Sequence, residues 1–201
     1  DAFTRLGEAT GQARWIDEAV RVARALIELF DDEEMGGFFT TGADAPELVT
    51  RAKDRFDNAT PAANSLAIVA LVRLWALTGR RQLLDRAEAA MRSIAPLLEQ
   101  HPTAFAHALR GVELRALGPT EVVIVGQSDV AELVEAAMTT HRPTAVLAWG
   151  EPYMSPLWEG RDAGRAYVCQ GYVCQSPATS PADLIRNCLL YTSPSPRDIG
   201  E

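Results

Sequence analysis

The stretch from Leu66 to Leu77 places the strongest limit on what this chain can fold into. Its sequence, Leu-Ala-Ile-Val-Ala-Leu-Val-Arg-Leu-Trp-Ala-Leu, contains a single charged side chain, Arg73. A helix on the surface of a globular protein has a wide polar face, and this stretch has none. We therefore expect a helix that is buried nearly all round. Thr60 as N-cap and Pro61 as first helical residue predict that it begins at about residue 61.

The segments around this stretch predict helices of two alternating kinds. Residues 13–30 and 80–99 have apolar side chains at i, i+3, i+4 and i+7 with charged side chains opposite, which is typical of amphipathic helices. Residues 3–9 read as the last turns of an earlier helix. Residues 103–117 are again mostly apolar. The core contacts expected from this last helix are Phe105, Ala108, Leu109, Val112 and Leu117.

An internal repeat supports this alternation. Residues 6–19 match residues 74–87, and each copy contains the end of one helix, a Thr-Gly turn and the start of an amphipathic helix. Helix pairs repeated in this way bury a continuous core only when they stack on their neighbours. Residues 1–118 are therefore expected to form part of a double layer of helices.

From Pro119 onward the hydrophobic period changes. Residues 121–126 form a β-branched run that ends in glycine, residues 128–140 predict a helix, and residues 144–149 predict a second strand. We interpret residues 119–187 as a small α/β subdomain built on a β-α-β unit, with a third strand at residues 166–169. The turn at Gly126 lacks both the G-x-G-x-x-G and the lysine-bearing phosphate-loop patterns, which argues against nucleotide binding.

A charged loop runs directly into the buried helix and is the main candidate for a ligand site. It contributes Arg51, Lys53 and Asp57, and Asn64 lies in the first helical turn. Free backbone N–H groups and partial positive charge at a helix N-terminus can hold an anion or a polyol. The alternative is that the charges neutralise one another in a structural loop, with Asn64 bonded only to the backbone.

This loop also carries a family resemblance. The pattern Arg-x-Lys-x-x-x-Asp-x-Ala-x-Pro-x-x-Asn, from Arg51 to Asn64, and the apolar helix ending in Leu-Thr-Gly resemble the spermatogenesis-associated thioredoxin-like family. The resemblance covers roughly residues 5–187. It implies a mainly α fold, a partial α/α toroid of the six-hairpin glycosidase-like kind, and an N-terminal thioredoxin-like domain that is missing here. Many members have Ser-Gly where this chain has Ala62-Ala63, so any role of that hydroxyl is absent.

The resemblance leaves two classes of function open. In one, this C-terminal fragment of a thioredoxin domain-containing protein binds a carbohydrate-like small molecule or a protein client without catalysing a reaction. In the other, it is part of a carbohydrate-active enzyme, either a glycosidase or a sugar epimerase. A glycosidase needs two carboxylates at a defined separation. Asp54 and Asp57 are three residues apart on one loop, so we favour binding.

Cys169 and Cys174 form the remaining chemical candidate, a possible thiol pair. Gly171 makes a turn that can bring the two sulfurs together, and the aromatic-Val-Cys strand followed by Cys-x-x-Pro again resembles the family. Thioredoxin-type chemistry requires Cys-x-x-Cys at a helix N-terminus, which this segment lacks. Buried free thiols in an intracellular chain are therefore the default expectation. His101, His107 and His141 show no ligand spacing, so we expect no metal and no cofactor.

The composition of the chain limits its possible partners and its location in the cell. The net charge of −8 and the pI near 5.0 argue against a nucleic-acid partner or an anionic membrane. The sequence has neither an uncharged apolar segment of membrane-spanning length nor a signal peptide, which favours a cytoplasmic protein.

The two ends of the sequence suggest a fragment. The chain begins at Asp1 instead of Met. Residues 188–198, Cys-Leu-Leu-Tyr-Thr-Ser-Pro-Ser-Pro-Arg-Asp, back-translate to what resembles a sequencing adapter. We therefore interpret residues 188–201 as an adapter-derived, non-native tail that does not pack, and a natural Ser/Pro-rich tail is the alternative.

Overall fold

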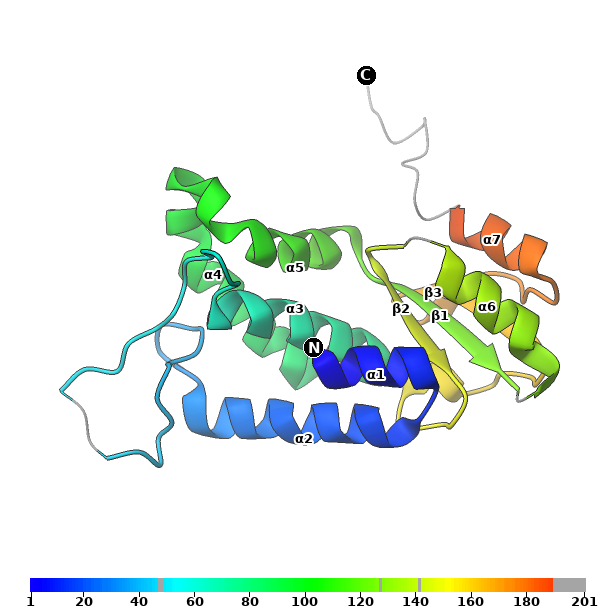
Figure 1. The fold of residues 1–201 in the computed structure, drawn as a ribbon, viewed down its shortest axis with the longest axis horizontal. Helices are drawn as coiled ribbons and strands as arrows, with labels where there is room; N and C mark the ends of the chain where they lie inside the picture. Colours follow the sequence, from blue (N-terminus) through cyan, green and yellow to red (C-terminus); the bar gives the residue numbers. More distant parts are fainter. Residues whose placement is uncertain (47–48, 127, 141, 190–201) are drawn as a thin grey trace, which may run out of the picture.

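The computed structural model describes residues 1–46, 49–126, 128–140 and 142–189. Five helices form one body, and a small sheet follows with two further helices beyond it (Figure 1). The five helices are α1 (Ala2–Thr10), α2 (Ala13–Phe30), α3 (Ala63–Thr78), α4 (Arg81–Gln100) and α5 (Ala106–Leu117), with a short 3₁₀ helix, η1 (Pro102–Phe105), before α5. The mainly helical class expected from the sequence is confirmed.

Helix α3 lies at the centre of the helical body, as the apolar run predicts. Most side chains from Asn64 to Thr78 are buried, Arg73 among them at 2% exposed, whereas Leu66 is 41% exposed. The helix begins at Ala63, so the predicted start at Pro61 is wrong by two residues. Thr60 does not cap it, because carboxylates from the preceding loop bind the first amides instead.

Helices α2 and α4 are amphipathic and bury one face each, as their sequence patterns predict. Helix α5 was predicted less well. Leu109 and Leu117 were expected in the core but are 36% and 61% exposed. Only one face of α5 packs against α3, where Gly111 allows close approach: a Cβ there would lie 2.5 Å from Cγ2 of Ile68. Within the part of the chain that the structure describes, no further layer covers the opposite face of α5, so its leucines stay exposed.

The sheet has four strands in the order β2-β1-β3-β4. Strand β1 (Thr120–Val125) leads through η2 (Ser128–Val130) and α6 (Ala131–Thr139) to β2 (Ala145–Trp149), which pairs with it in parallel. The predicted β-α-β unit is therefore present. Strand β3 (Arg165–Gln170) follows η3 (Pro156–Trp158) and lies antiparallel to β1, and β4 (Val173–Cys174) pairs with β3 as an edge strand.

The two faces of the sheet pack against different partners. Val123 and Val146 belong to the same hydrophobic cluster as the helices of residues 1–118. Val122 and Ile124 point to the other face, where they pack with α6 and α7 (Pro181–Leu189). The helical part and the α/β part therefore share a continuous core.

Helix α7 extends beyond the predicted start of the non-native tail. Cys188 and Leu189 are its last two residues, and the Cys188 side chain is 2% exposed in the cluster that contains Leu184. Residues four apart lie on the same helix face, so Cys188 continues the apolar face begun by Leu184. The expectation that Cys188 belongs to an unpacked tail is therefore wrong. Residues 190–201 lie outside the described residues.

Candidate functional site

The loop between α2 and α3 folds back onto the start of α3. Asn64, which is 1% exposed, accepts a hydrogen bond from the Phe38 amide (2.7 Å) and donates to the Phe38 carbonyl (2.9 Å). Its side-chain amide also donates to the Asp54 carbonyl at 2.7 Å. Asn64 thereby joins two parts of the loop that are far apart in sequence. The segment around Phe38 therefore lies beside the charged loop at the start of α3.

Arg51 and Lys53 both lie against the ring of Phe39. Nη2 of Arg51 donates to the carbonyls of Thr41 (2.5 Å) and Leu29 (3.1 Å), and its guanidinium carbon is 4.1 Å from the centre of the Phe39 ring. Lys53 Nζ pairs with Asp32 at 2.6 Å and is 4.9 Å from the same ring centre. The two cations therefore fix the loop through carbonyl groups, a carboxylate and a ring face.

Asp57 connects the starts of two helices. Its Oδ1 accepts a hydrogen bond from the Ala62 amide before α3, and its Oδ2 accepts one from the His107 amide in the first turn of α5, each at 2.8 Å. Burial raises the pKa of Asp57, but these amide hydrogen bonds outweigh it and hold the pKa below its ordinary value. Asp54 Oδ2 accepts from the Ala63 amide at 2.9 Å. The expectation of unpaired N–H groups here is wrong, because the chain's own carboxylates bind them.

A pocket of about 370 Å³ opens beside these residues. We call it the rim pocket; its lining residues are Asp32, Met35, Phe39, Arg51, Lys53, Arg55 and Phe56. Three cations and two aromatic rings thus face one carboxylate. Nε of Arg55 is buried and has no hydrogen-bond partner among the described residues, unlike the partnered nitrogens of Arg51 and Lys53. Arg55 was not predicted as a site residue, although it lies between two that were.

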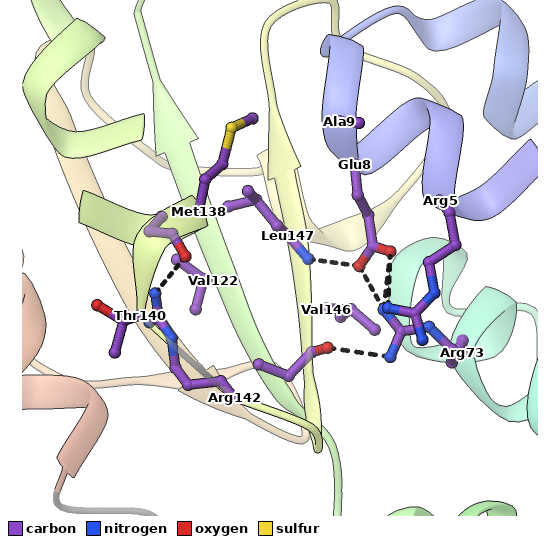
Figure 2. A pocket seen from close by; sticks show the side chains of 12 residues that line it. Arg5, Glu8, Ala9, Arg73, Val122, Met138, Thr140, Arg142, Val146 and Leu147 are labelled. Atoms are coloured by element: carbon purple, nitrogen blue, oxygen red, sulfur yellow. Dashed lines mark hydrogen bonds and ion pairs between the residues drawn. The ribbon is translucent and has the colours of Figure 1, made fainter. Parts of the chain in front are cut away.

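A second pocket, of about 400 Å³, lies between α1, α3 and the sheet (Figure 2). At its side, Nη2 of the buried Arg73 donates to both oxygens of Glu8 at 2.6 and 2.7 Å. Nη1 of Arg73 donates to the Ala145 carbonyl at 3.1 Å, and the Leu147 amide donates to Glu8 Oε1 at 3.0 Å. The Arg73–Glu8 pair therefore binds two helices to strand β2. In the sequence, this pair is indicated by Arg73, the single charged residue of the apolar run from Leu66 to Leu77.

Cys169 and Cys174 are joined in a disulfide, and Cys188 is a buried free thiol. The default expectation of free thiols at 169 and 174 is therefore wrong. The two residues are direct partners in the antiparallel β3–β4 pairing, which places their side chains on the same face of the sheet. Turn composition alone could not establish that register.

Within the described ranges, no three His, Cys, Asp or Glu side chains gather closely enough to hold a metal ion. No helix in the same residues is both long enough and apolar enough to cross a membrane.

Comparison with known proteins supports the family resemblance that the motif from Arg51 to Asn64 suggested. Over 194 residues the chain is 28% identical to spermatogenesis-associated protein 20 of Homo sapiens, an alignment that covers 89% of this chain. It is 26% identical to the proteins of the same name from Rattus norvegicus and Mus musculus. The chain is similar to spermatogenesis-associated protein 20. It spans about a quarter of the length of these relatives. No family model matches the chain.

Proposed function

We propose that this chain is a ligand-binding part of an α/α toroid and that the rim pocket takes a carbohydrate-like ligand bearing a carboxylate or phosphate. Three observations support the toroid: the buried helix α3 between the amphipathic helices α2 and α4, the repeat of residues 6–19 at 74–87, and the similarity to spermatogenesis-associated protein 20. We extend the proposal to the intact protein, in which a thioredoxin-like domain precedes the toroid in the cytoplasm.

Arg55 carries the proposal. Arg55 lines the rim pocket, and its buried Nε has no partner among the described residues. No described residue pairs with the charge of this guanidinium, and an anionic ligand in the pocket would supply that charge-assisted contact. Phe39 and Phe56 line the same pocket and offer apolar surface on which a sugar ring can pack.

The structure gives less support to the hydrolytic alternative. Asp54 and Asp57 are the carboxylates within the motif, and both accept hydrogen bonds from backbone amides at the starts of helices. Asp32, which does line the rim pocket, pairs with Lys53 at 2.6 Å. An acid/base pair needs carboxyl groups directed into a cavity where substrate binds. Neither Asp54 nor Asp57 lines the rim pocket. A binding role therefore fits this site better than hydrolysis.

The test compares Arg55→Ala with Arg24→Ala. Arg24 is an exposed arginine on α2 that lines a different surface, so its variant has the same change in charge away from the rim. Calorimetric titration with a uronic acid, a hexose phosphate and the neutral hexose is expected to detect binding of the two anionic sugars. Arg55→Ala should weaken that binding by about 1 to 3 kcal/mol, the value of a charge-assisted contact.

Arg24→Ala should bind as the unchanged protein does, and both variants should keep its melting temperature. Equal affinity of the Arg55→Ala and Arg24→Ala proteins for the anionic sugars would remove Arg55 from the site. Preference for the neutral hexose would contradict the anionic character of the ligand.

A further inference from the structure

Three polar or reactive side chains form a row across the strands of the sheet. Glu121 on β1 lies directly opposite Cys169 on β3, and Cys169 lies directly opposite Cys174 on β4. Side chains opposite one another on neighbouring antiparallel strands share a face and lie within contact range. The row therefore joins a carboxyl group to a disulfide on the face that packs against the helices.

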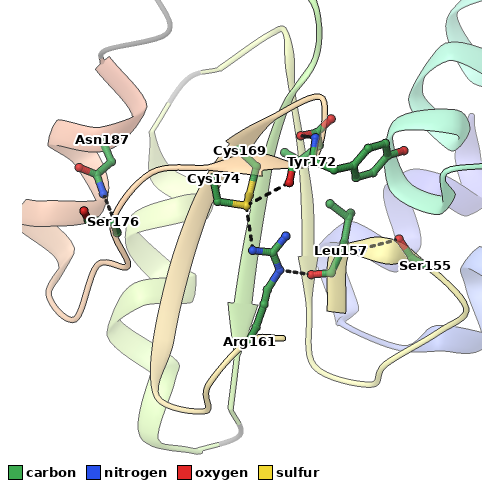
Figure 3. Close-up of a disulfide and its surroundings, with 9 residues drawn as sticks. Ser155, Leu157, Arg161, Cys169, Tyr172, Cys174, Ser176 and Asn187 are labelled. Carbon is green, nitrogen blue, oxygen red and sulfur yellow. Dashed lines mark hydrogen bonds between the residues drawn. A yellow bond between two sulfur atoms is a disulfide. The ribbon is translucent and has the colours of Figure 1, made fainter. Parts of the chain in front are cut away.

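The two sulfurs differ in accessibility and in surroundings. Cys169 is 0% exposed, whereas Cys174 is half-buried on the edge strand. Arg161 extends from the loop before β3, and its Nη1 lies 2.8 Å from Sγ of Cys174 (Figure 3). The same side chain donates to the Leu157 carbonyl, which holds the guanidinium in place. A positive charge beside a sulfur favours its thiolate form.

The surroundings of Glu121 stabilise its charged form only weakly. It is 0% exposed in an inner strand; its Oε2 accepts a hydrogen bond from the Tyr172 amide at 3.2 Å, and its Oε1 has no partner among the described residues. Burial raises its pKa to about 7, although the turn amides and Arg161 oppose the effect. Near neutral pH a large fraction of Glu121 therefore carries a proton beside Cys169.

The crosslink adds little as a structural constraint. The two cysteines are five positions apart, and the β3–β4 pairing already closes the short loop between them. The entropic stabilisation from a disulfide grows with the length of the loop that it closes, so it is small here. In a cytoplasmic protein, which is part of the function proposed above, disulfides are usually transient.

We propose that the Cys169–Cys174 disulfide is a thiol–disulfide exchange site for a low-molecular-weight monothiol of the glutathione class, which attacks Sγ of Cys174. The incoming thiolate forms a mixed disulfide with Cys174 and breaks the bond to Cys169. Cys169 leaves as a thiolate and takes the proton of Glu121. A second monothiolate then attacks the sulfur of the bound monothiol, which releases its symmetric disulfide and leaves Cys174 as a thiolate beside Arg161.

The first experiment needs no variant. The folded, oxidised chain is incubated with reduced glutathione near neutral pH, quenched with an alkylating agent and mapped by mass spectrometry. We expect one glutathione on Cys174, with Cys169 alkylated only after the disulfide has opened. Cys188, a buried thiol in α7, serves as the internal control and should stay unmodified until the protein is denatured. An adduct on Cys169, equal adducts on both cysteines, or no reaction before denaturation would overturn the proposal.

The second experiment tests the two neighbours of the disulfide. Arg161→Gln should slow the complete reduction of the disulfide by glutathione about tenfold, because Cys174, which leaves as a thiolate in the second exchange, loses its positive neighbour. Arg165→Gln is the matched control at the start of β3, where Arg165 is exposed and, among the described residues, pairs with Asp162 at 3.6 Å. Glu121→Gln keeps an acceptor for the Tyr172 amide but has no proton to give, so it should also slow the opening.

Far-ultraviolet circular dichroism establishes that each variant is folded before its rate is compared. If Arg161→Gln does not fold, Arg161→Lys keeps the charge and should retain a rate close to that of the unchanged protein. Equal rates for Arg161→Gln and Arg165→Gln would refute the role of Arg161. An Arg161→Lys protein as slow as expected for Arg161→Gln would refute it as well.

Discussion

Replacing Glu121 by Gln should remove a loss of folding stability that the unchanged protein undergoes as pH rises. The carboxyl group is fully buried in strand β1, and burial raises its pKa from 4.5 to about 7 against the opposing effects of the Tyr172 and Gly171 amides and of Arg161. In the unfolded chain this carboxyl group loses its proton near 4.5, whereas in the folded chain it keeps the proton until about pH 7. The free energy of unfolding of the unchanged protein therefore falls as pH rises through this window.

The size of the effect follows from the two pKa values. Each pKa unit corresponds to about 1.36 kcal/mol, so a rise from 4.5 to about 7 corresponds to about 3 kcal/mol. Gln has no proton to lose and still offers an oxygen to the Tyr172 amide. The Glu121→Gln protein should therefore gain about 3 kcal/mol relative to the unchanged protein between about pH 4.5 and about pH 8.

Urea unfolding of the oxidised proteins across this range measures the difference. Other groups that titrate in the window are common to both proteins, so their contributions cancel. Glu159→Gln, at an exposed carboxylate on the loop before β3, serves as the control and should follow the unchanged protein. A constant difference between the Glu121→Gln and unchanged proteins across the pH range would refute the reasoning, as would a difference that shrinks with rising pH.

Three further changes test the packing around the candidate site. Asp57→Ala should destabilise the fold by about 2 kcal/mol, because the starts of two helices lose a carboxylate acceptor, and urea unfolding measures the loss. Glu8→Ala should cost about 3 to 5 kcal/mol by leaving Arg73 buried without its carboxylate, and an unchanged melting temperature would contradict this. Gly111→Ala should cost about 1 to 3 kcal/mol, because the added Cβ would lie 2.5 Å from a methyl group of Ile68; thermal unfolding measures it, and a neutral result would mean that α5 can move away from α3.

Hydrophobic periodicity predicted most of the secondary structure. The amphipathic pattern of residues 13–30 coincides with α2, and the apolar run with its single arginine predicted the buried helix α3. The β-branched runs predicted strands β1 and β2 around a helix. These predictions succeed because a helix that buries one face has apolar residues at the helical period. A helix that is buried all round is instead apolar throughout.

The candidate ligand site stays a prediction. Arg51 and Lys53 line the rim pocket, whereas Asp57 and Asn64 do not. What the side chains bind could not be read from their order. Asp57 was expected to share the site with free amides, yet it binds the amides of two helices, one of them fifty residues away.

The sequence by itself determined where the chain is helical, which helix is buried, and that a β-α-β unit follows, because these properties depend on neighbours within a few residues. Only the tertiary structure decided which polar groups are already paired. Glu8 neutralises Arg73 across 65 residues, and the β3–β4 register places Cys169 opposite Cys174 beside the buried Glu121. Such pairings depend on how separate elements pack together, and Arg55 stands out at the rim only after the partners of its neighbours are known.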